Sequence, residues 1–276
     1  MEEKKLIIAK SITQAVKLKD KDSTFLSGGT EINRLGSLVN VNNLISIKKL
    51  FLNEISLAKL EEKDGKHHEY VKIGAGATFQ SMIESEIVPD YLKTACYFMS
   101  SRTKRNMATI GGNVALLRDD SYLLPTLLAS DSKLEFSTGR IINLDNYLID
   151  NDKYKDNLIV CFYVNSKTFV SSKRYSNTAA SHAVITMSVG WSRKNGFKVS
   201  LALKNSGVYV FPELAEFMDA NLRSTETEFL NHFKSTKDFR IKDDMYGSAD
   251  YKRYLLGITC FDLTNAVKTM REEVKK

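Results

Sequence analysis

Cysteine and long apolar runs are scarce in this chain, and each scarcity excludes a class of protein. The three cysteines, Cys96, Cys161 and Cys260, lie far apart without a CxxC spacing, which argues against a zinc site or a four-cysteine iron–sulfur cluster. We therefore expect each to be a small buried hydrophobic residue. No apolar run reaches the roughly 18 residues that a membrane helix needs, and the N-terminal one is too short for a secretory signal. The sequence predicts a soluble, cytoplasmic protein without a membrane partner.

Histidine is rare as well, and the positive charge is not concentrated. The four histidines show neither a catalytic triad nor metal-ligand spacing, so we expect no catalytic side chain and no metal site. The 40 basic and 33 acidic residues give a net charge of +7, but lysines are scattered along the chain. The one local basic cluster, Arg102–Arg105, is too small for a nucleic-acid interface, so we expect no nucleic-acid partner.

The length and the order of expected elements indicate two domains. A chain of 276 residues that is 43% hydrophobic exceeds most single compact cores. Strands and helices mix up to about residue 165, and the polar stretch Asn165–Ser172 follows as a boundary. Beyond it, Asn195-Gly196 between two strand-like runs predicts a hairpin, and helices fill the rest. We expect an α+β architecture with domains at 1–166 and 167–276, and no doubly wound βαβ alternation.

The spacing of apolar residues, together with residues that start or end helices and strands, predicts the positions of the elements. We expect strands at Leu6–Ala9, Thr24–Leu26, Leu44–Ile47, Val71–Ile73, Lys133–Phe136, Arg140–Asn143, Leu158–Val164, Val184–Trp191 and Lys198–Leu203. We expect helices at Ser11–Lys17, Glu31–Leu38, after Thr78, Tyr91–Arg102, Ser121–Ala129, Pro212–Ala220, Thr225–Phe233 and Ala249–Val274. The charged stretch Glu61–Glu69 indicates a hairpin or a surface loop.

Two glycine pairs carry the chemistry that this sequence shows. Gly28-Gly29-Thr30 follows an expected strand, and Thr109-Ile110-Gly111-Gly112-Asn113 repeats the pattern 80 residues later. Without Cβ atoms, backbone N–H groups can approach an anion and bind phosphate oxygens, and a following helix N-terminus adds positive potential. Each pair alone is also typical of a plain tight turn, and neither has Rossmann or Walker spacing. Two such turns together would suit a diphosphate-bridged dinucleotide.

Six segments stand in an order that resembles a known family. They are Phe25–Ile32, Leu44–Ile47, Ile73–Thr78, Arg105–Asn113, Leu123–Ala129 and Ser248–Arg253. They resemble landmarks of the molybdopterin dehydrogenase FAD-binding family, which includes the flavin subunits of xanthine dehydrogenase and carbon monoxide dehydrogenase. Arg105–Asn113 is the most specific match. The resemblance implies a two-part FAD-binding domain of the PCMH or vanillyl-alcohol-oxidase-like type. A small C-terminal α+β domain, with an antiparallel sheet and helices, follows it as in carbon monoxide dehydrogenase flavoproteins.

The resemblance also implies which residues meet FAD. The cofactor-binding set is Leu26, Ser27, Gly28, Gly29, Thr30, Glu31, Thr109, Ile110, Gly111, Gly112, Asn113, Ile159 and Lys173. One departure weakens it: where the family has a Ser-Pro pair and then an Asp that contacts the cofactor, this chain has Arg118, Asp119 and Tyr122. That departure implies weaker FAD affinity, an altered contact through Asp120, or loss of the cofactor. For Arg118 the alternatives are a phosphate contact and a salt bridge.

By this resemblance the chain is the FAD-binding electron-transfer subunit of a molybdenum hydroxylase of the xanthine dehydrogenase type. A molybdenum–pterin large subunit and a [2Fe–2S] small subunit would be its partners, and NAD or another acceptor would take the electrons. It would be an oxidoreductase subunit that is active only in a hetero-oligomeric complex. Two alternatives stay open: a non-catalytic scaffold subunit that has lost or weakened FAD binding, and a stand-alone flavin oxidase.

Overall fold

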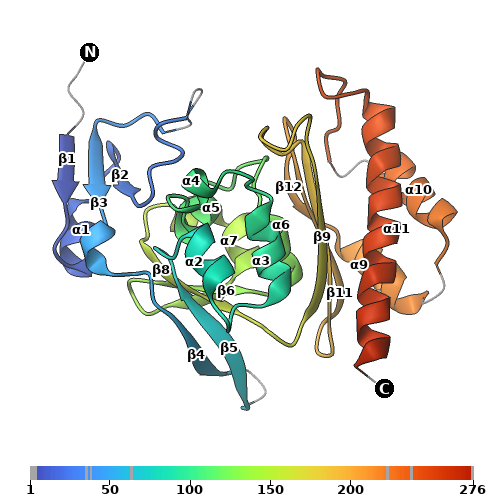
Figure 1. Cartoon of the computed structure of the whole chain (residues 1–276), viewed down its shortest axis with the longest axis horizontal. Coiled ribbons are helices and arrows are strands. Elements are labelled where there is room, and N and C mark those ends of the chain that lie inside the picture. Colours follow the sequence, from blue (N-terminus) through green and yellow to red (C-terminus); the bar gives the residue numbers. More distant parts are fainter. Residues whose placement is uncertain are drawn as a thin grey trace. The chain divides into compact units, whose positions relative to one another are not determined.

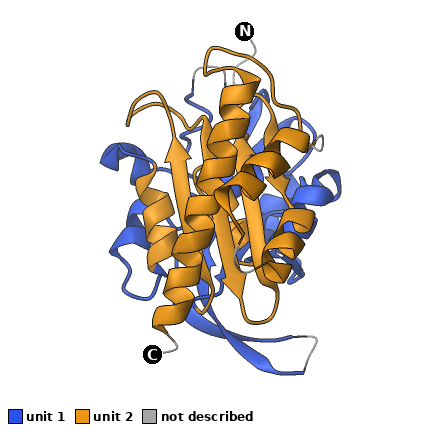
Figure 2. Ribbon diagram, turned by 90° about the vertical axis from the view of Figure 1, so that its right-hand side faces the viewer, with its two compact units in different colours: residues 1–89, 99–116, 132–166 blue, residues 90–98, 117–131, 167–276 orange. Residues whose placement is uncertain are grey.

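The computed structural model describes residues 5–34, 37, 39–62, 65–221, 224–236 and 239–274. They form two compact units, each built from several stretches of chain (Figure 2). Unit 1 comprises Met1–Pro89, Met99–Leu116 and Ser132–Ser166; unit 2 comprises Asp90–Phe98, Leu117–Asp131 and Lys167–Lys276. The division into domains at 1–166 and 167–276 stays a prediction. In the part of the chain described, no helix is both long and apolar enough to cross a membrane.

Unit 1 begins with a small parallel sheet in the strand order β1-β3-β2. Its strands are β1 (Lys5–Ile8), β2 (Ser23–Leu26) and β3 (Asn43–Ser46), and helix α1 (Ile12–Leu18) connects β1 to β2. Ser11 caps α1 by accepting a hydrogen bond from the Gln14 N–H at 3.1 Å. Ala15 of α1 and Ile45 of β3 are fully buried in one small core. This sheet places the first glycine pair directly after β2.

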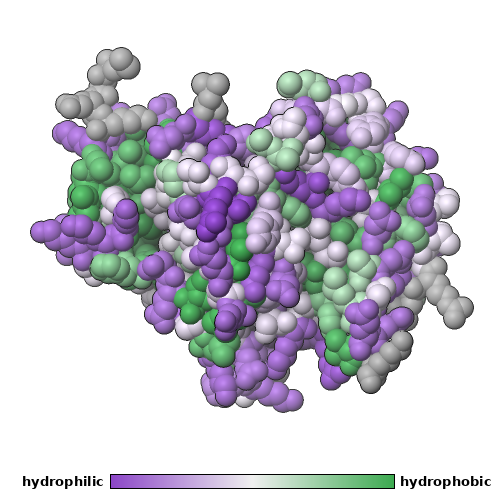
Figure 3. Space-filling model, viewed as in Figure 1, coloured by the Kyte–Doolittle hydropathy of each residue, from purple (hydrophilic) through white to green (hydrophobic). Residues whose placement is uncertain are grey.

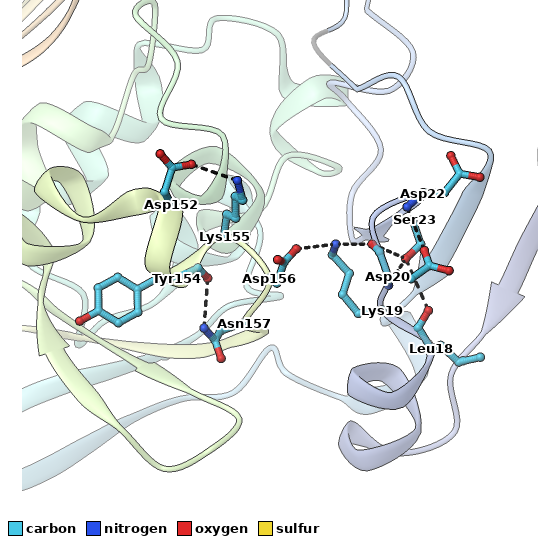
Figure 4. Close-up of polar contacts among 10 residues, drawn as sticks. All are labelled: Leu18, Lys19, Asp20, Asp22, Ser23, Asp152, Tyr154, Lys155, Asp156 and Asn157. Carbon is cyan, nitrogen blue, oxygen red and sulfur yellow. Dashed lines mark hydrogen bonds and ion pairs between the residues drawn. The ribbon is translucent and has the colours of Figure 1, made fainter.

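Polar contacts tie the end of α1 to the chain that leads into the second sheet of unit 1 (Figure 4). The ammonium group of Lys19 lies 2.8 Å from an Asp156 carboxylate oxygen and 2.8 Å from the Asp20 carbonyl oxygen. The Ser23 hydroxyl accepts the Asp20 N–H at 2.8 Å, which closes the turn before β2. The start of β2 is therefore anchored to the segment before residue 159.

The second sheet of unit 1 has five antiparallel strands in the order β4-β5-β8-β6-β7. Their bounds are β4 (Ile55–Glu61), β5 (His67–Gly74), β6 (Lys133–Phe136), β7 (Ile141–Asn143) and β8 (Ile159–Val164). The helices of unit 1 besides α1 are α2 (Phe79–Glu84), α4 (Arg102–Arg105), α5 (Ile110–Ala115), α7 (Leu144–Ile149) and α8 (Asn151–Tyr154), and one 3-10 turn, η1, spans Lys48–Leu50. Thr78 caps α2 through a capping box with Ser81, as its sequence predicts.

The cysteines are free and buried, as expected. Cys161 of β8 donates a hydrogen bond to a Glu135 carboxylate oxygen at 3.2 Å, and Tyr163 donates to the same oxygen at 2.7 Å. Burial first, and then the contact with Glu135, raises the pKa of Cys161 to about 12.

Cys161 is therefore expected to resist alkylation in the folded protein at pH 8, because its thiol is protonated and inaccessible. Iodoacetamide followed by mass spectrometry should label Cys161 only after denaturation. The raised pKa also predicts that this group's contribution to stability is full below pH 9 and falls as the pH rises towards 12. Rapid labelling of the native protein would show that the β8 segment opens locally.

Unit 2 is a four-stranded antiparallel sheet with helices on both faces (Figure 1). The strand order is β12-β11-β10-β9, with bounds β9 (Phe169–Tyr175), β10 (Ile185–Ser192), β11 (Gly196–Leu203) and β12 (Gly207–Val210). One face carries α3 (Asp90–Tyr97) and α6 (Leu124–Ala129); the other carries α9 (Pro212–Ala220) and the long α11 (Ala249–Glu273), against which α10 (Glu226–Ser235) packs. The core between the sheet and these three helices includes Phe211, Phe229 and Phe233.

Helix α6 lies unusually close to the sheet of unit 2. A Cβ atom on Gly190 of β10 would be 1.9 Å from the Ala129 carbonyl oxygen, so only glycine fits there. The Ser200 hydroxyl donates to the Pro125 carbonyl oxygen at 2.6 Å, and the Thr126 hydroxyl is 2.9 Å from that of Ser172. These contacts fix residues 117–131 to the C-terminal sheet.

Three sequence expectations differ from the structure. Residues Glu31–Arg34 form turns rather than the start of a helix, and Leu35, Gly36 and Leu38 of that stretch lie outside the described residues. The helix expected over Tyr91–Arg102 is two helices, because Ser101 caps a new one by accepting the Lys104 N–H at 3.3 Å. The helix expected from Ser121 begins at Leu124. The sequence analysis missed β4, β9, β12, α4, α5, α7 and α8, and β9 begins inside the stretch Asn165–Ser172 that it expected as a polar boundary.

Candidate functional site

The first glycine pair forms a turn at the carboxyl end of β2. Gly29 has a φ of +72°, a left-handed conformation that glycine adopts without steric cost. A Cβ atom on Gly28 would lie 1.6 Å from the Met107 carbonyl oxygen, so the turn packs directly on the chain before Thr109. The fold thus brings the first glycine pair against the start of the second motif, although they are 80 residues apart in sequence.

The N–H groups of this turn are available to a ligand. Among the described residues, those of Gly28, Gly29 and Thr30 donate to no protein acceptor, and all three residues are partly exposed. Successive backbone N–H groups without protein acceptors, at a turn that contains glycine, can bind phosphate oxygens. Nearby, the Glu31 carboxylate lies 3.7 Å from the Arg34 guanidinium, which offsets its charge. This turn therefore fits a pyrophosphate group.

The second glycine pair does not form a loop between elements. It lies inside helix α5, in the first helical turn. Thr109 is the N-cap, and its hydroxyl accepts the Gly112 N–H at 3.2 Å. The Ile110 and Gly111 N–H groups donate to the Ala77 and Ala75 carbonyl oxygens, at 3.0 and 2.9 Å. The Asn113 N–H donates to the Thr109 carbonyl oxygen at 3.0 Å. Four of the five backbone N–H groups of this motif, those of residues 110–113, are thus used within the protein, which the sequence analysis did not anticipate.

The close contact of Ala75 with Gly111 explains why the second motif needs glycine. A Cβ atom on Gly111 would lie 2.7 Å from the Ala75 carbonyl oxygen, and the Ala75 N–H donates to the Val160 carbonyl oxygen at 2.9 Å. Ile159, the first residue of β8, precedes Val160 and is 6% exposed. Segment 75–77 thus connects β8 to α5 through backbone hydrogen bonds. In the sequence, the only sign of this role is the pair of glycines that flank Ala75.

Lys173 lies in unit 2, on β9, whereas the other residues of the expected cofactor-binding set belong to unit 1. A hydrogen bond with Tyr175 raises the pKa of Lys173, with a further contribution from Asp262, whose carboxylate is 3.8 Å away. The side chain is 47% exposed and cationic at neutral pH. Its approach to a cofactor stays a prediction, as does the whole cofactor-binding set.

The residues at the departure from the family pattern make contacts within unit 2. Arg118 forms an ion pair with the buried Asp120 at 3.0 Å, and Lys204 lies 3.4 Å from the other Asp120 oxygen. Asp119 accepts the Asn205 N–H at 2.8 Å. The Tyr122 hydroxyl is 3.3 Å from Nδ1 of His182. Of the two roles considered for Arg118, the structure shows the salt bridge.

Comparisons with known proteins identify chains that are similar in sequence. A family model described as the FAD binding domain in molybdopterin dehydrogenase matches residues 2–164. The uncharacterized protein YgfM of Escherichia coli (strain K12) is 26% identical over 257 residues, which are 92% of this chain and 92% of that protein.

Solved structures share the fold at low sequence identity. A carbon monoxide dehydrogenase from Hydrogenophaga pseudoflava that lacks the Mo-pyranopterin moiety of the molybdenum cofactor matches with a TM-score of 0.78 and 19% identity, over 97% of this chain and 98% of that one. Quinoline 2-oxidoreductase from Pseudomonas putida 86 matches with a TM-score of 0.76 and 16% identity, over 96% and 97%.

These matches confirm the expected α+β fold, with a two-part FAD-binding domain followed by a C-terminal domain. The family model covers more than half of the 276 residues and includes both glycine motifs. The chain belongs to the family of FAD-binding domains of molybdopterin dehydrogenases.

Proposed function

We propose that this chain binds FAD and acts as the electron-transfer subunit of a cytoplasmic molybdenum hydroxylase complex. In that complex it accepts electrons from the [2Fe–2S] clusters of a small subunit, while a molybdenum–pterin large subunit oxidises the substrate. It delivers the electrons to NAD or another acceptor. The observation that carries the proposal is the set of uncommitted N–H groups at Gly28, Gly29 and Thr30, in a chain of this family.

In this proposal the two glycine motifs have different tasks. The N–H groups of the first turn bind the pyrophosphate oxygens, and Gly29 allows the left-handed backbone that this turn needs. The second motif supports the turn, because four of its five N–H groups are already bonded within the protein. FAD, when bound, supplies the exchange of one and two electrons, so the protein's task is to hold and orient it.

The visible spectrum of the purified chain tests the proposal. We expect flavin bands near roughly 370 and 450 nm, as the cofactor itself shows, and about one FAD released per chain on denaturation. Purification through a tag on this chain should also recover iron and molybdenum. A colourless chain that takes up no added FAD would contradict the proposal.

A scaffold subunit that has lost FAD is the second candidate, and one observation favours it. Arg118, Asp119 and Tyr122 stand where the family carries a cofactor contact, and all three side chains are engaged within unit 2. A scaffold would assemble with the same partners but remain colourless after incubation with FAD. Recovery of the complex without flavin would therefore favour this candidate.

A further inference from the structure

Strand β1 is an open edge of the small parallel sheet. Among the described strands it pairs only with β3, in unbroken register over its four residues. Leu6 is 59% exposed and Ile8 is 47% exposed, whereas β2, at the opposite edge, carries no exposed residue. Natural proteins usually protect an edge strand with a proline, a bulge or a central charge. Because β1 has none of these, it is a template for another strand.

The hydrogen bonds of β1 show which of its backbone groups face outwards. The N–H groups of Lys5 and Ala9 donate to carbonyl oxygens at the two ends of the β3 segment, at 2.8 and 3.0 Å. The backbone groups of successive residues in a strand point to opposite sides. The N–H and C=O groups of Leu6 and Ile8 therefore point away from β3, out of the edge of the sheet.

The side chains of the same two residues share one face of the sheet. Ile7 is the register partner of Ile45, which is fully buried in the core that α1 joins. Since side chains alternate along a strand, Leu6 and Ile8 lie on the opposite face. Figure 3 shows a hydrophobic area over β1 and α1. The outward backbone groups and the exposed apolar side chains of this edge thus belong to the same two residues.

The edge of β1 is complementary to itself. A twofold axis perpendicular to the sheet pairs two copies of β1 antiparallel and keeps corresponding faces on the same side. With Ile7 on the axis, Leu6 of each copy stands opposite Ile8 of the other, and each such pair exchanges two hydrogen bonds. Lys5 stands opposite Ala9, so no like charges meet within the strand.

We propose that β1 is a dimer interface, at which two copies of this chain join their three-stranded sheets into one continuous sheet centred on Ile7. A second copy is the occupant because it supplies both the matching apolar pattern and the matching hydrogen-bonding groups. The inference is independent of the proposed function, since it uses no residue of either glycine motif. The paired segment is short, so we expect a weak dimer with a dissociation constant on the order of 10 µM.

Sedimentation equilibrium of the full chain, over roughly 1–100 µM around that constant, tests the inference. Salt at about 0.15 M screens the net charge of +7 on each copy. Leu6→Asp and Ile8→Lys each place a charge opposite an apolar side chain in both pairs of the dimer. The dissociation constant of each variant should therefore rise about 30-fold or more. Both side chains are exposed, so the fold and the FAD content should not change.

An equimolar mixture of the two variants tests the register. In a mixed dimer the new carboxylate stands opposite the new ammonium group in one pair, and the other pair keeps Leu6 against Ile8. We expect the mixture to regain dimers that neither variant forms alone, because opposite charges across antiparallel strands attract each other. A mixture that stays monomeric would overturn this pairing.

Leu57→Asp is the matched control. Leu57 is 73% exposed and lies on β4, an edge strand of the other sheet of unit 1, so this variant should dimerise like wild type. Dissociation by Leu57→Asp and not by Leu6→Asp would overturn the inference. A wild-type chain that is still monomeric at about 100 µM, ten times the expected dissociation constant, would also overturn it, whichever other protein covers β1.

Discussion

Gly28→Ala is expected to disrupt the first glycine turn and to abolish FAD binding. The new methyl group would lie 1.6 Å from the Met107 carbonyl oxygen and 2.6 Å from its carbonyl carbon. Backbone atoms cannot move aside as the end of a flexible side chain can, so the turn itself has to shift. We expect the free energy of unfolding to fall by about 3 kcal/mol or more, the upper range for overpacking.

Denaturant unfolding and FAD titration of the purified variant measure the two effects. Gly139→Ala is the control, because Gly139 has a φ of +79° but no atom within 4 Å of the added Cβ. It therefore carries only the conformational cost, about 1 kcal/mol, and should keep full FAD affinity. If Gly28→Ala is as stable as Gly139→Ala, the packing of the turn on Met107 is not as described.

Asp120→Ala is the second substitution with a large expected effect. Asp120 is 3% exposed, and its two carboxylate oxygens pair with Arg118 and Lys204. Its removal leaves two cations that are only 15% and 19% exposed. We expect a loss of about 2–3 kcal/mol, less than for a fully buried pair because both cations can turn towards water.

Thermal and denaturant unfolding of Asp120→Ala should be compared with Asp152→Ala. Asp152 pairs with Lys155 at the same distance, 3.0 Å, but its side chain is 97% exposed, so its loss should leave the stability nearly unchanged. Equal effects of the two substitutions would contradict the structural role given to Asp120. Loss of FAD from a folded Asp120→Ala chain would instead support the altered cofactor contact that the sequence analysis considered.

Local sequence signals predicted most of the helices and strands whose ends are marked by capping residues, proline or glycine. The helix over Pro212–Ala220 matches its expected bounds, because Pro212 starts it and the apolar spacing is regular. The Asn195-Gly196 hairpin likewise joins β10 and β11. In these places the local preference and the final fold agree, so sequence reasoning succeeds.

Elements that depend on distant contacts could not be read from the sequence. Two glycines argue against a helix at Gly111 and Gly112, but the Ala75 and Ala77 carbonyl oxygens hold the start of α5 in place. Strand β4 is fixed by its pairing with β5 more than by its weak alternation. The packing of residues 90–98 and 117–131 with the C-terminal sheet also joins residues far apart in the chain.

The candidate site shows the same division. The glycines and the hydroxyl residues of the two motifs were visible in the sequence, and so was the departure at Arg118, Asp119 and Tyr122. Which N–H groups remain for a ligand depends on tertiary hydrogen bonds. These bonds use the N–H groups of residues 110–113 in the second motif and leave those of the first motif for a ligand.

Backbone amide NMR of the isotope-labelled chain during an FAD titration tests the central claim most directly. The account predicts saturation at one FAD per chain, with large shifts of the Gly28, Gly29 and Thr30 amides and of the FAD phosphorus resonances. The Gly111 and Gly112 amides, which are bonded to Ala75 and Thr109, should shift much less. Large shifts at Gly111 and Gly112 with none at Gly29 and Thr30, or no response to FAD at all, would contradict it.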